Sequence, residues 1–336
     1  MKLKALFAIM ICFVVSGCHK VDDWDNDLYG NFDALWTIID EHYCFLEQKG
    51  VDWDEIGTRY RAQIDPEWSQ RELFDHCAMM LAELKDGHTN LISWFDVSYY
   101  RNWWSDYPQN FNQRLIEQYY LNFDYRTSGV VSYKLLEEEN IGYMRYSSFS
   151  GSAGTAFLTQ MFVNFKETAG LIIDVRDNPG GDLTNVESFI RHFIDKPITG
   201  GYIRHKTGPG HNEFSEPYPM NYEPAQVGVI WLKPVVVLTN RSTFSAANNF
   251  VSIMKDLDQV TVIGDTTGGG CGMPYSSEIP VGWGVRFSAV PIYNSKMELT
   301  EFGIAPHIHV DMEPEMEAKG IDTILESAIA YIHSLK

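Results

Sequence analysis

Hydrophobic residues recur at helical spacing in the first third of the chain. Residues 31–92 carry apolar side chains three and four positions apart, which is typical of amphipathic helices. Ser69 and Glu72 form a capping-box pair that predicts the start of the last of these helices. Gly87 marks the predicted end of that helix, and His88 follows immediately.

The pattern changes near residue 131 to short apolar runs that alternate with helical patterns. The runs predict strands at 141–149, 170–175, 234–239 and 260–265. The helical patterns lie at 154–167, up to about residue 193, and at 245–257. Further strands are predicted around 279–310, and a last helix near 321–334. This alternation predicts an α/β fold with a parallel-rich sheet and helical crossovers.

The first eighteen residues have the pattern of a targeting segment. Lys2 and Lys4 precede an apolar run from Ala5 to Val15, which is too short to span a bilayer comfortably. The sequence VSGC that follows resembles the lipobox of bacterial lipoproteins, in which Cys18 would carry the lipid. We therefore expect a bacterial cell-envelope protein with a lipid anchor that attaches it to a membrane; an ordinary secretory signal is the alternative.

These patterns divide the chain into five segments. They are a signal peptide (1–17), a lipidated tether (18–30), a helical N-terminal subdomain (31–92), an aromatic-rich connection (93–130) and an α/β core (131–336). The aromatic residues of the connection are expected to pack against the core, with a peptide-binding surface as the alternative.

Composition limits the partners more than the fold. The chain has 336 residues, is 45% hydrophobic and 14% aromatic, which suits a large core and argues against disorder. Its formal net charge of −19 would repel nucleic acid, so no nucleic-acid partner is expected. Cys44, Cys77 and Cys271 follow the targeting segment. Their odd number gives no disulfide framework, so buried thiols are expected rather than a Cys44–Cys77 bond.

Three polar stretches follow predicted strands of the core, where α/β sheets gather their functional groups. They read RDNPGGD, NRSTFSA and DTTGGGCG. Ser245 lies between a strand and a helix, which suits a nucleophile with the Ala246 N–H as oxyanion donor, but serine is also a preferred N-cap. Gly180 and Gly181 allow close approach of the backbone to a ligand and could supply a second donor, or form a plain turn.

A nucleophilic serine needs a base. His88 lies in the turn after a helix, where a histidine is usually a surface residue. His307 and His309 lie on one predicted strand and would suit a metal, but no third ligand is apparent in the sequence. From the residues alone these alternatives stay open.

Taken in order, the motifs of the chain resemble those of peptidase family S41, the tail-specific and carboxy-terminal processing proteases. They are ELKDGHTNL, IGYMRYSSF, LIIDVRDNPGGDL, VVVLTNRSTFSAANNF, and GDTTGG with EFGIAPHIHV. The resemblance extends along nearly the whole mature chain, and the DNPGG motif is its most specific part. It implies a crotonase-like core with a helical N-terminal subdomain, and it aligns Ser245 with the family's nucleophile.

The chain departs from one branch of this family and resembles the other. In the first branch a lysine is the base, but Gly270 takes its place here. The second branch, similar to the tricorn protease core, pairs histidine with a supporting glutamate, which implies His88 as the base. Glu301 is the candidate glutamate, although one position out of register, and Glu298 is the alternative. Only about fifty residues separate DGHTNL from IGYMRY, so no PDZ domain is expected between them.

The expectation is a lipid-anchored serine peptidase that cleaves peptide or protein substrates without a metal or organic cofactor. His88 would take the proton of Ser245, and Glu301 would orient His88. Ala246 with Gly180 or Gly181 would bind the oxyanion. An imidazole of ordinary pKa would make activity rise with pH through roughly 6–7.

Two other classes of protein remain as alternatives. One is a catalytically inactive, peptide-binding surface lipoprotein on the same fold. The other is a metal-dependent hydrolase that uses His307 and His309.

Overall fold

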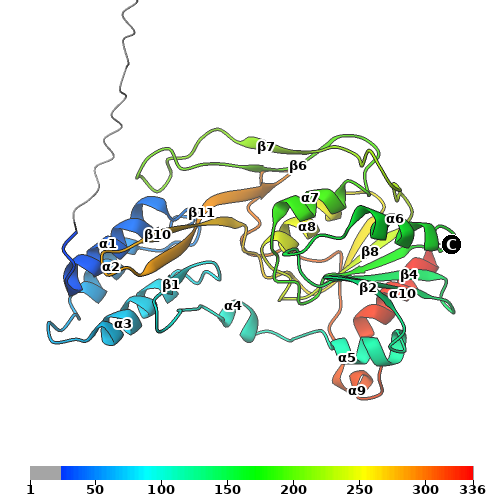
Figure 1. Ribbon diagram of the computed structural model, residues 1–336, viewed down its shortest axis with the longest axis horizontal. Coiled ribbons are helices and arrows are strands. Elements are labelled where there is room, and N and C mark those ends of the chain that lie inside the picture. Colours follow the sequence, from blue (N-terminus) through cyan, green and yellow to red (C-terminus); the bar gives the residue numbers. More distant parts are fainter. Residues whose placement is uncertain (1–23, 336) are drawn as a thin grey trace, which may run out of the picture.

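The computed structural model describes residues 24–335 and contains a seven-stranded sheet at one end of the molecule (Figure 1). The strand order is β12 (Ile308–His309), β9 (Val260–Gly264), β8 (Val235–Thr239), β5 (Leu171–Asp174), β4 (Ile141–Tyr146), β3 (Val131–Leu136) and β2 (Arg126–Ser128). Strands β12 to β4 pair in parallel, while β3 and β2 extend the sheet antiparallel. The predicted parallel-rich sheet is therefore confirmed.

Helices cover both faces of this sheet because its central strands are apolar on both sides. Leu171 and Ile173 of β5 belong to the cluster that includes α6 (Thr155–Asn164), α7 (Leu183–Ile190) and α8 (Ala246–Lys255). Ile172, between them, faces the opposite cluster with α10 (Thr323–Ser334). The alternation of side chains along a strand thus gives the core two layers of helices.

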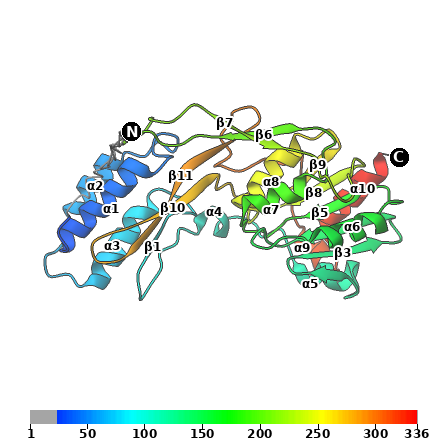
Figure 2. The ribbon, with the colours of Figure 1, turned by 45° about the horizontal axis from the view of Figure 1, so that its top comes forward.

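A second sheet, antiparallel, joins the core to the N-terminal helices. Its strands are β1 (Asn90–Ile92), β6 (Ile198–Ile203), β7 (Tyr218–Tyr222), β10 (Gly272–Glu278) and β11 (Gly284–Asn294). Helices α1 (Leu28–His42), α2 (Trp53–Arg61) and α3 (Gln70–Ala82) lie beside the long β10–β11 hairpin in both views (Figures 1 and 2). The apolar cluster of this lobe includes Trp283 and Phe287. The helical subdomain therefore draws part of its core from residues far beyond 92.

Local capping sets where the N-terminal helices begin. Asp27 caps α1, so the first helix starts inside the segment expected to be a tether. The capping box of Ser69 and Glu72 opens α3, as predicted. The segment 93–130 forms the short helices α4 (Asn102–Ser105) and α5 (Gln113–Leu115) and the π-helix η1 (Ile116–Tyr120), while α9 (Pro314–Glu317) precedes the last helix.

Three further expectations concern the termini and the cysteines. The predicted signal peptide and Cys18 lie outside the described residues. Between residues 24 and 335, no helix is both long and apolar enough to cross a membrane. Cys44, Cys77 and Cys271 are buried free thiols, as expected, so the Cys44–Cys77 bond is not formed.

Candidate active site

The carboxyl ends of β5, β8 and β9 bring the three polar stretches together. The N–H of Phe244 donates to the Asn178 carbonyl at 3.0 Å, and the N–H of Ser245 donates to the Gly269 carbonyl at 2.9 Å. Arg176 begins the first of these stretches, RDNPGGD. It is fully buried and pairs with the carboxylate of Asp174 at 2.6 Å and with that of Asp322 at 2.8 Å, which anchors the stretch. The serine therefore lies on a framework held by backbone contacts and buried ion pairs.

Ser245 has a strained backbone and points its hydroxyl at a histidine. It precedes α8 with φ 57° and ψ −122°, a combination that costs a residue other than glycine on the order of 1–3 kcal/mol. It occupies the N-cap position but makes no capping hydrogen bond with its side chain. Its Oγ lies 3.0 Å from Nε2 of His88. The conformation therefore presents the hydroxyl to the imidazole rather than to the helix.

His88 reaches Ser245 from the loop after α3, 157 residues away in the sequence. It is buried, and its ring packs against Phe244 with centroids 4.8 Å apart. Its backbone N–H donates to Oδ1 of Asp86 at 2.7 Å. Burial lowers the pKa of His88 to about 4; Asp86 opposes this, while Arg286 and Lys49 add to it. The ring is therefore neutral at physiological pH, and the tautomer with its hydrogen on Nδ1 can accept a proton at Nε2.

The structure does not bring Glu301 into hydrogen-bonding contact with His88. Oε1 of Glu301 pairs with Lys49 Nζ at 2.8 Å, and Oε2 accepts the N–H of Cys271 at 2.9 Å. Nδ1 of His88 makes no hydrogen bond of ordinary geometry among residues 24–335, although the backbone of Gly272 lies near enough to raise the pKa of the ring. Glu298, the other candidate, is exposed and accepts from the Asn294 side chain at 2.8 Å. The expected contact between Glu301 and His88 is absent because the carboxylate of Glu301 pairs with Lys49 instead.

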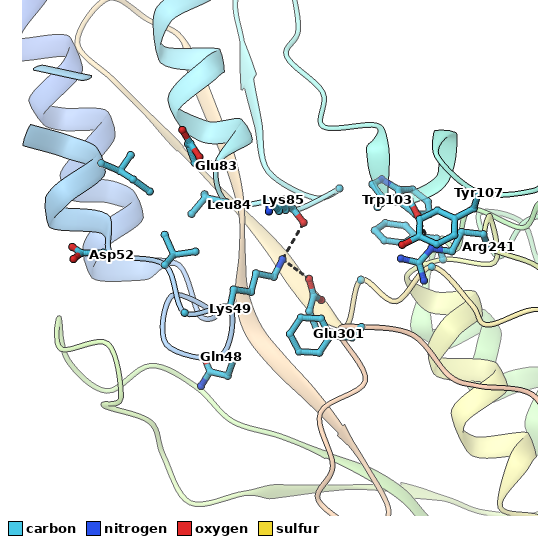
Figure 3. Close-up of a pocket in the computed structure, with 18 of the residues that line it drawn as sticks. Gln48, Lys49, Asp52, Glu83, Leu84, Lys85, Trp103, Tyr107, Arg241 and Glu301 are labelled. Atoms are coloured by element: carbon cyan, nitrogen blue, oxygen red, sulfur yellow. Dashed lines mark hydrogen bonds and ion pairs between the residues drawn. The ribbon is translucent and has the colours of Figure 1, made fainter. Parts of the chain in front are cut away.

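Sequence reasoning missed the buried cluster around Lys49, whose contacts with Glu301 and with the Lys85 carbonyl are drawn in Figure 3. Its Nζ lies 3.7 Å from Asp86 Oδ2, which also accepts from the Tyr43 hydroxyl at 2.8 Å. Burial disfavours the charge on Asp86, yet Lys49 and His88 keep its pKa below the ordinary value. Burial and Asp86 raise the pKa of Glu301 to about 7, although Lys49 opposes them. Two carboxylates thus share one ammonium, and no sequence motif marked Lys49.

Gly181 and Ala246 line the same cavity as Ser245. Within the described chain, no acceptor is found for the N–H of Gly181 or of Ala246, the first residue of α8. The N–H of Gly180 donates instead to Oδ1 of Asn178 at 2.9 Å. A Cβ on Gly180 would lie 2.8 Å from Cβ of Ser245, so only glycine fits there. Of the two glycines, Gly181 therefore has the N–H that is free for a ligand.

Two cavities meet near the serine. A cavity of about 560 Å³ contains Ser245, Ala246 and Gly181, with apolar walls from Leu183, Met273, Pro274 and Ile292. A second cavity of about 760 Å³ contains Lys49 and Glu301 and is bordered by Trp103 and Phe244. Gly270 is the residue that lines both. The charged cluster is thus reached through a different opening from the serine.

Gly270 explains why a lysine is missing from this loop. It has φ +74°, and an added Cβ would lie 2.3 Å from the ring of Phe244. Phe244 in turn stacks on Trp103, with centroids 4.1 Å apart. The space next to the backbone of residue 270 is thus filled by an aromatic ring that also contacts His88.

His307 and His309 lie apart from the serine. Nδ1 of His307 accepts the N–H of Val262 at 3.0 Å, and exposed His309 lies 3.3 Å from the carboxylate of Asp311. Among residues 24–335, no group of three or more His, Cys, Asp or Glu residues has the arrangement of a metal site. Nothing in this geometry favours the metal-dependent alternative.

Comparison with known proteins agrees with this fold and site. The model of peptidase family S41 matches residues 140–310, just over half of the chain, and that of the tricorn protease C1 domain matches residues 25–82. A Parabacteroides merdae protein, whose crystal structure is described as that of a candidate peptidase, is 48% identical with a TM-score of 0.88. That match covers 92% of this chain and 97% of the other.

Curated relatives match over shorter regions. A carboxy-terminal processing protease from Bacillus subtilis is 31% identical over 139 residues, and one from Picosynechococcus is 28% identical over 188 residues. These matches cover 41% and 54% of this chain, but only 27% and 42% of the relatives' lengths. Mature CPAF, at 12% identity and a TM-score of 0.70, shares the fold over 92% of this chain and 98% of its own.

The chain belongs to peptidase family S41.

Proposed function

We propose that the protein is a serine peptidase in which Ser245 is the nucleophile and His88 the general base. The observation that carries this proposal is the 3.0 Å contact between Ser245 Oγ and His88 Nε2. Nε2 takes the hydroxyl proton as Oγ attacks the carbonyl carbon of the scissile peptide bond. The imidazolium then gives that proton to the leaving amine, and water releases the acyl group by the same route.

The oxyanion of the tetrahedral intermediate is bound by backbone N–H groups of Ala246 and Gly181. Both N–H groups are free within the described residues, and Ala246 begins a helix, whose N-terminal end favours negative charge. Gly180 serves as a close-packed neighbour of Ser245 rather than as a donor. No metal or organic cofactor takes part in this scheme.

The substrate is a peptide or protein segment bound in the 560 Å³ cavity beside Ser245. The apolar wall of Leu183, Met273, Pro274 and Ile292 favours a hydrophobic side chain next to the scissile bond. We place the activity among serine endopeptidases or carboxy-terminal processing peptidases, because two relatives carry the latter name.

A fluorophosphonate probe tests this proposal, because only an activated serine reacts with it. We expect one covalent adduct, which mass spectrometry maps to Ser245 and which is absent in Ser245→Ala. A folded wild-type protein that stays unlabelled would instead support an inactive, peptide-binding member of the family.

A lipid anchor at Cys18 would hold the enzyme to a membrane of the cell envelope. The sequence VSGC supports this assignment. Cys18→Ser should move the protein from the membrane fraction to a soluble or unprocessed pool. Wild-type protein without an acyl group by mass spectrometry, together with unchanged fractionation of the variant, would contradict the anchor.

A further inference from the structure

Lys49 lies between two buried carboxylates, and the proposed mechanism uses none of these three groups. Its ammonium is 2.8 Å from Glu301 Oε1 and 3.7 Å from Asp86 Oδ2. The side chains of Lys49, Glu301 and Asp86 are only 9%, 5% and 0% exposed. A buried lysine between two carboxylates holds both in place, because each loses its counter-charge if the ammonium is removed.

The remaining oxygen of each carboxylate binds a backbone N–H of the site. Oδ1 of Asp86 accepts from His88 at 2.7 Å, and Oε2 of Glu301 accepts from Cys271 at 2.9 Å. The first N–H belongs to His88, whose ring faces Ser245. The second belongs to Cys271, in the loop whose Gly269 carbonyl accepts the N–H of Ser245. The two carboxylates therefore connect Lys49 to both sides of the serine.

The loop at Cys271 also shapes the substrate cavity. Gly270 and Gly272 flank Cys271, and both line the cavity beside Ser245. The Gly270 N–H donates to the Glu301 carbonyl at 3.2 Å, so Glu301 holds this loop through its backbone as well as its side chain. Displacement of Glu301 would thus move the cavity wall together with the support of Ser245.

We propose that Lys49 is a positioning residue of the peptidase site, which acts through Asp86 on His88 and through Glu301 on the 269–272 loop. The inference rests on the proposed function of Ser245 and His88. It assigns Glu301 a different task from the one expected: the carboxylate fixes the loop beside the nucleophile instead of orienting the imidazole. Lys49 comes from the turn between α1 and α2, so the N-terminal helices contribute directly to the geometry of the core.

Lys49 also acts on His88 through its charge. The charged groups that affect His88 are Asp86, which favours the imidazolium, and Arg286 and Lys49, which disfavour it. Removal of the ammonium removes one repulsion and leaves Asp86 without its cation. The lost repulsion favours protonation of His88. The acid limb of the reaction, the fall in rate as the pH is lowered, should therefore move to higher pH.

The test compares Lys49→Met with Lys85→Met by their rates of fluorophosphonate labelling. Both variants lose a lysine charge at the same cavity, but the Lys85 side chain is exposed and only its carbonyl contacts Lys49, at 3.3 Å. We expect Lys49→Met to label about 100-fold more slowly at pH 7.5, the effect of a misplacement of about 1 Å. Its acid limb should lie at higher pH than that of wild type. Lys85→Met should match wild type in both measurements.

The proposal is overturned if Lys49→Met keeps the wild-type rate and the wild-type acid limb. If Lys49→Met does not fold by circular dichroism, Glu301→Gln replaces it, because this variant keeps the Lys49–Asp86 pair. Labelling should then slow by at least about 10-fold, and a wild-type rate overturns the proposal. Absence of labelling in folded wild-type protein overturns the proposed function and this inference together. Normal wild-type labelling with an unaffected Lys49→Met overturns this inference alone.

Discussion

The low pKa of His88 predicts that the site keeps a working base in acid. As the pH is lowered from 8 to 3.5, Nε2 of His88 becomes protonated and can no longer take the proton of Ser245. The pKa falls from an ordinary 6.5 to about 4, mainly because burial disfavours the imidazolium. At 1.36 kcal/mol per pH unit, this corresponds to about 3 kcal/mol in favour of the neutral ring. The rise in activity expected at pH 6–7 from an ordinary imidazole thus moves to about pH 4.

The lowered pKa of His88 also makes the stability of the fold depend on pH. Between pH 6.5 and about 4 the unfolded chain binds a proton at His88 and the folded chain does not. His88 therefore makes the free energy of unfolding rise with pH through this window, and protonation of the buried ring destabilises the fold as the pH falls towards 4. Glu301, whose pKa is raised to about 7, contributes with the opposite sign between pH 4.5 and 7. Labelling in acid has to be measured on protein whose circular dichroism shows that it is still folded.

The assay is the second-order rate of fluorophosphonate labelling of Ser245 from pH 3.5 to 8. We expect the rate to fall in two steps, one near pH 7, where Glu301 takes up a proton, and one near pH 4, where His88 does. His205→Gln removes an exposed histidine outside the site and should leave this profile unchanged. A single midpoint near 6.5 that is unchanged in Glu301→Gln, with no step near pH 4, would contradict the lowered pKa of His88, because the base would then be solvated or be another residue.

Three substitutions test the packing around the site. Gly270→Ala places a Cβ 2.3 Å from the Phe244 ring and should lower the free energy of unfolding by about 1–3 kcal/mol; a wild-type urea midpoint would contradict the close contact. Arg176→Met leaves buried Asp174 without its ion-pair partner and should lower the free energy of unfolding by about 3–5 kcal/mol. A small change in melting temperature would contradict this. In Gly181→Ala, whose φ is +142°, the added Cβ would lie 2.1 Å from a backbone nitrogen, so the Gly181 N–H must shift and labelling should slow about 100-fold. An unchanged rate would show that Gly181 does not belong to the oxyanion site.

The parallel sheet could be predicted because its strands are almost continuously apolar. Residues 171–174 and 235–239 are buried on both faces, and such runs of β-branched and aliphatic residues have few other interpretations. In the antiparallel sheet, β11 falls within the strands predicted around 279–310, but β10 and β6 were missed for the opposite reason. Strand β10 contains Pro274 and two serines and shifts register after Met273, while β6 contains two glycines. Pairing with distant strands, rather than local preference, makes these segments extended.

The contact between Ser245 and His88 could be predicted only through the family resemblance. No spacing rule connects residues 157 positions apart, and each residue alone had an ordinary alternative. The resemblance did not indicate Lys49, because the burial of a lysine depends on two carboxylates that meet only in the folded chain. Glu301 was found by its motif, but its contact was decided by that lysine.

The proposed mechanism requires that Ser245 and His88 act as one unit in peptide hydrolysis. The most direct measurement is kcat/KM on a pool of internally quenched peptides for wild type, Ser245→Ala, His88→Ala and the double variant. We predict that each single substitution lowers kcat/KM by several orders of magnitude and that the double variant is little worse than either, because residues that act as a unit are not additive. Near-wild-type hydrolysis by His88→Ala, with Ser245→Ala inactive, would contradict the assignment of His88 as the base.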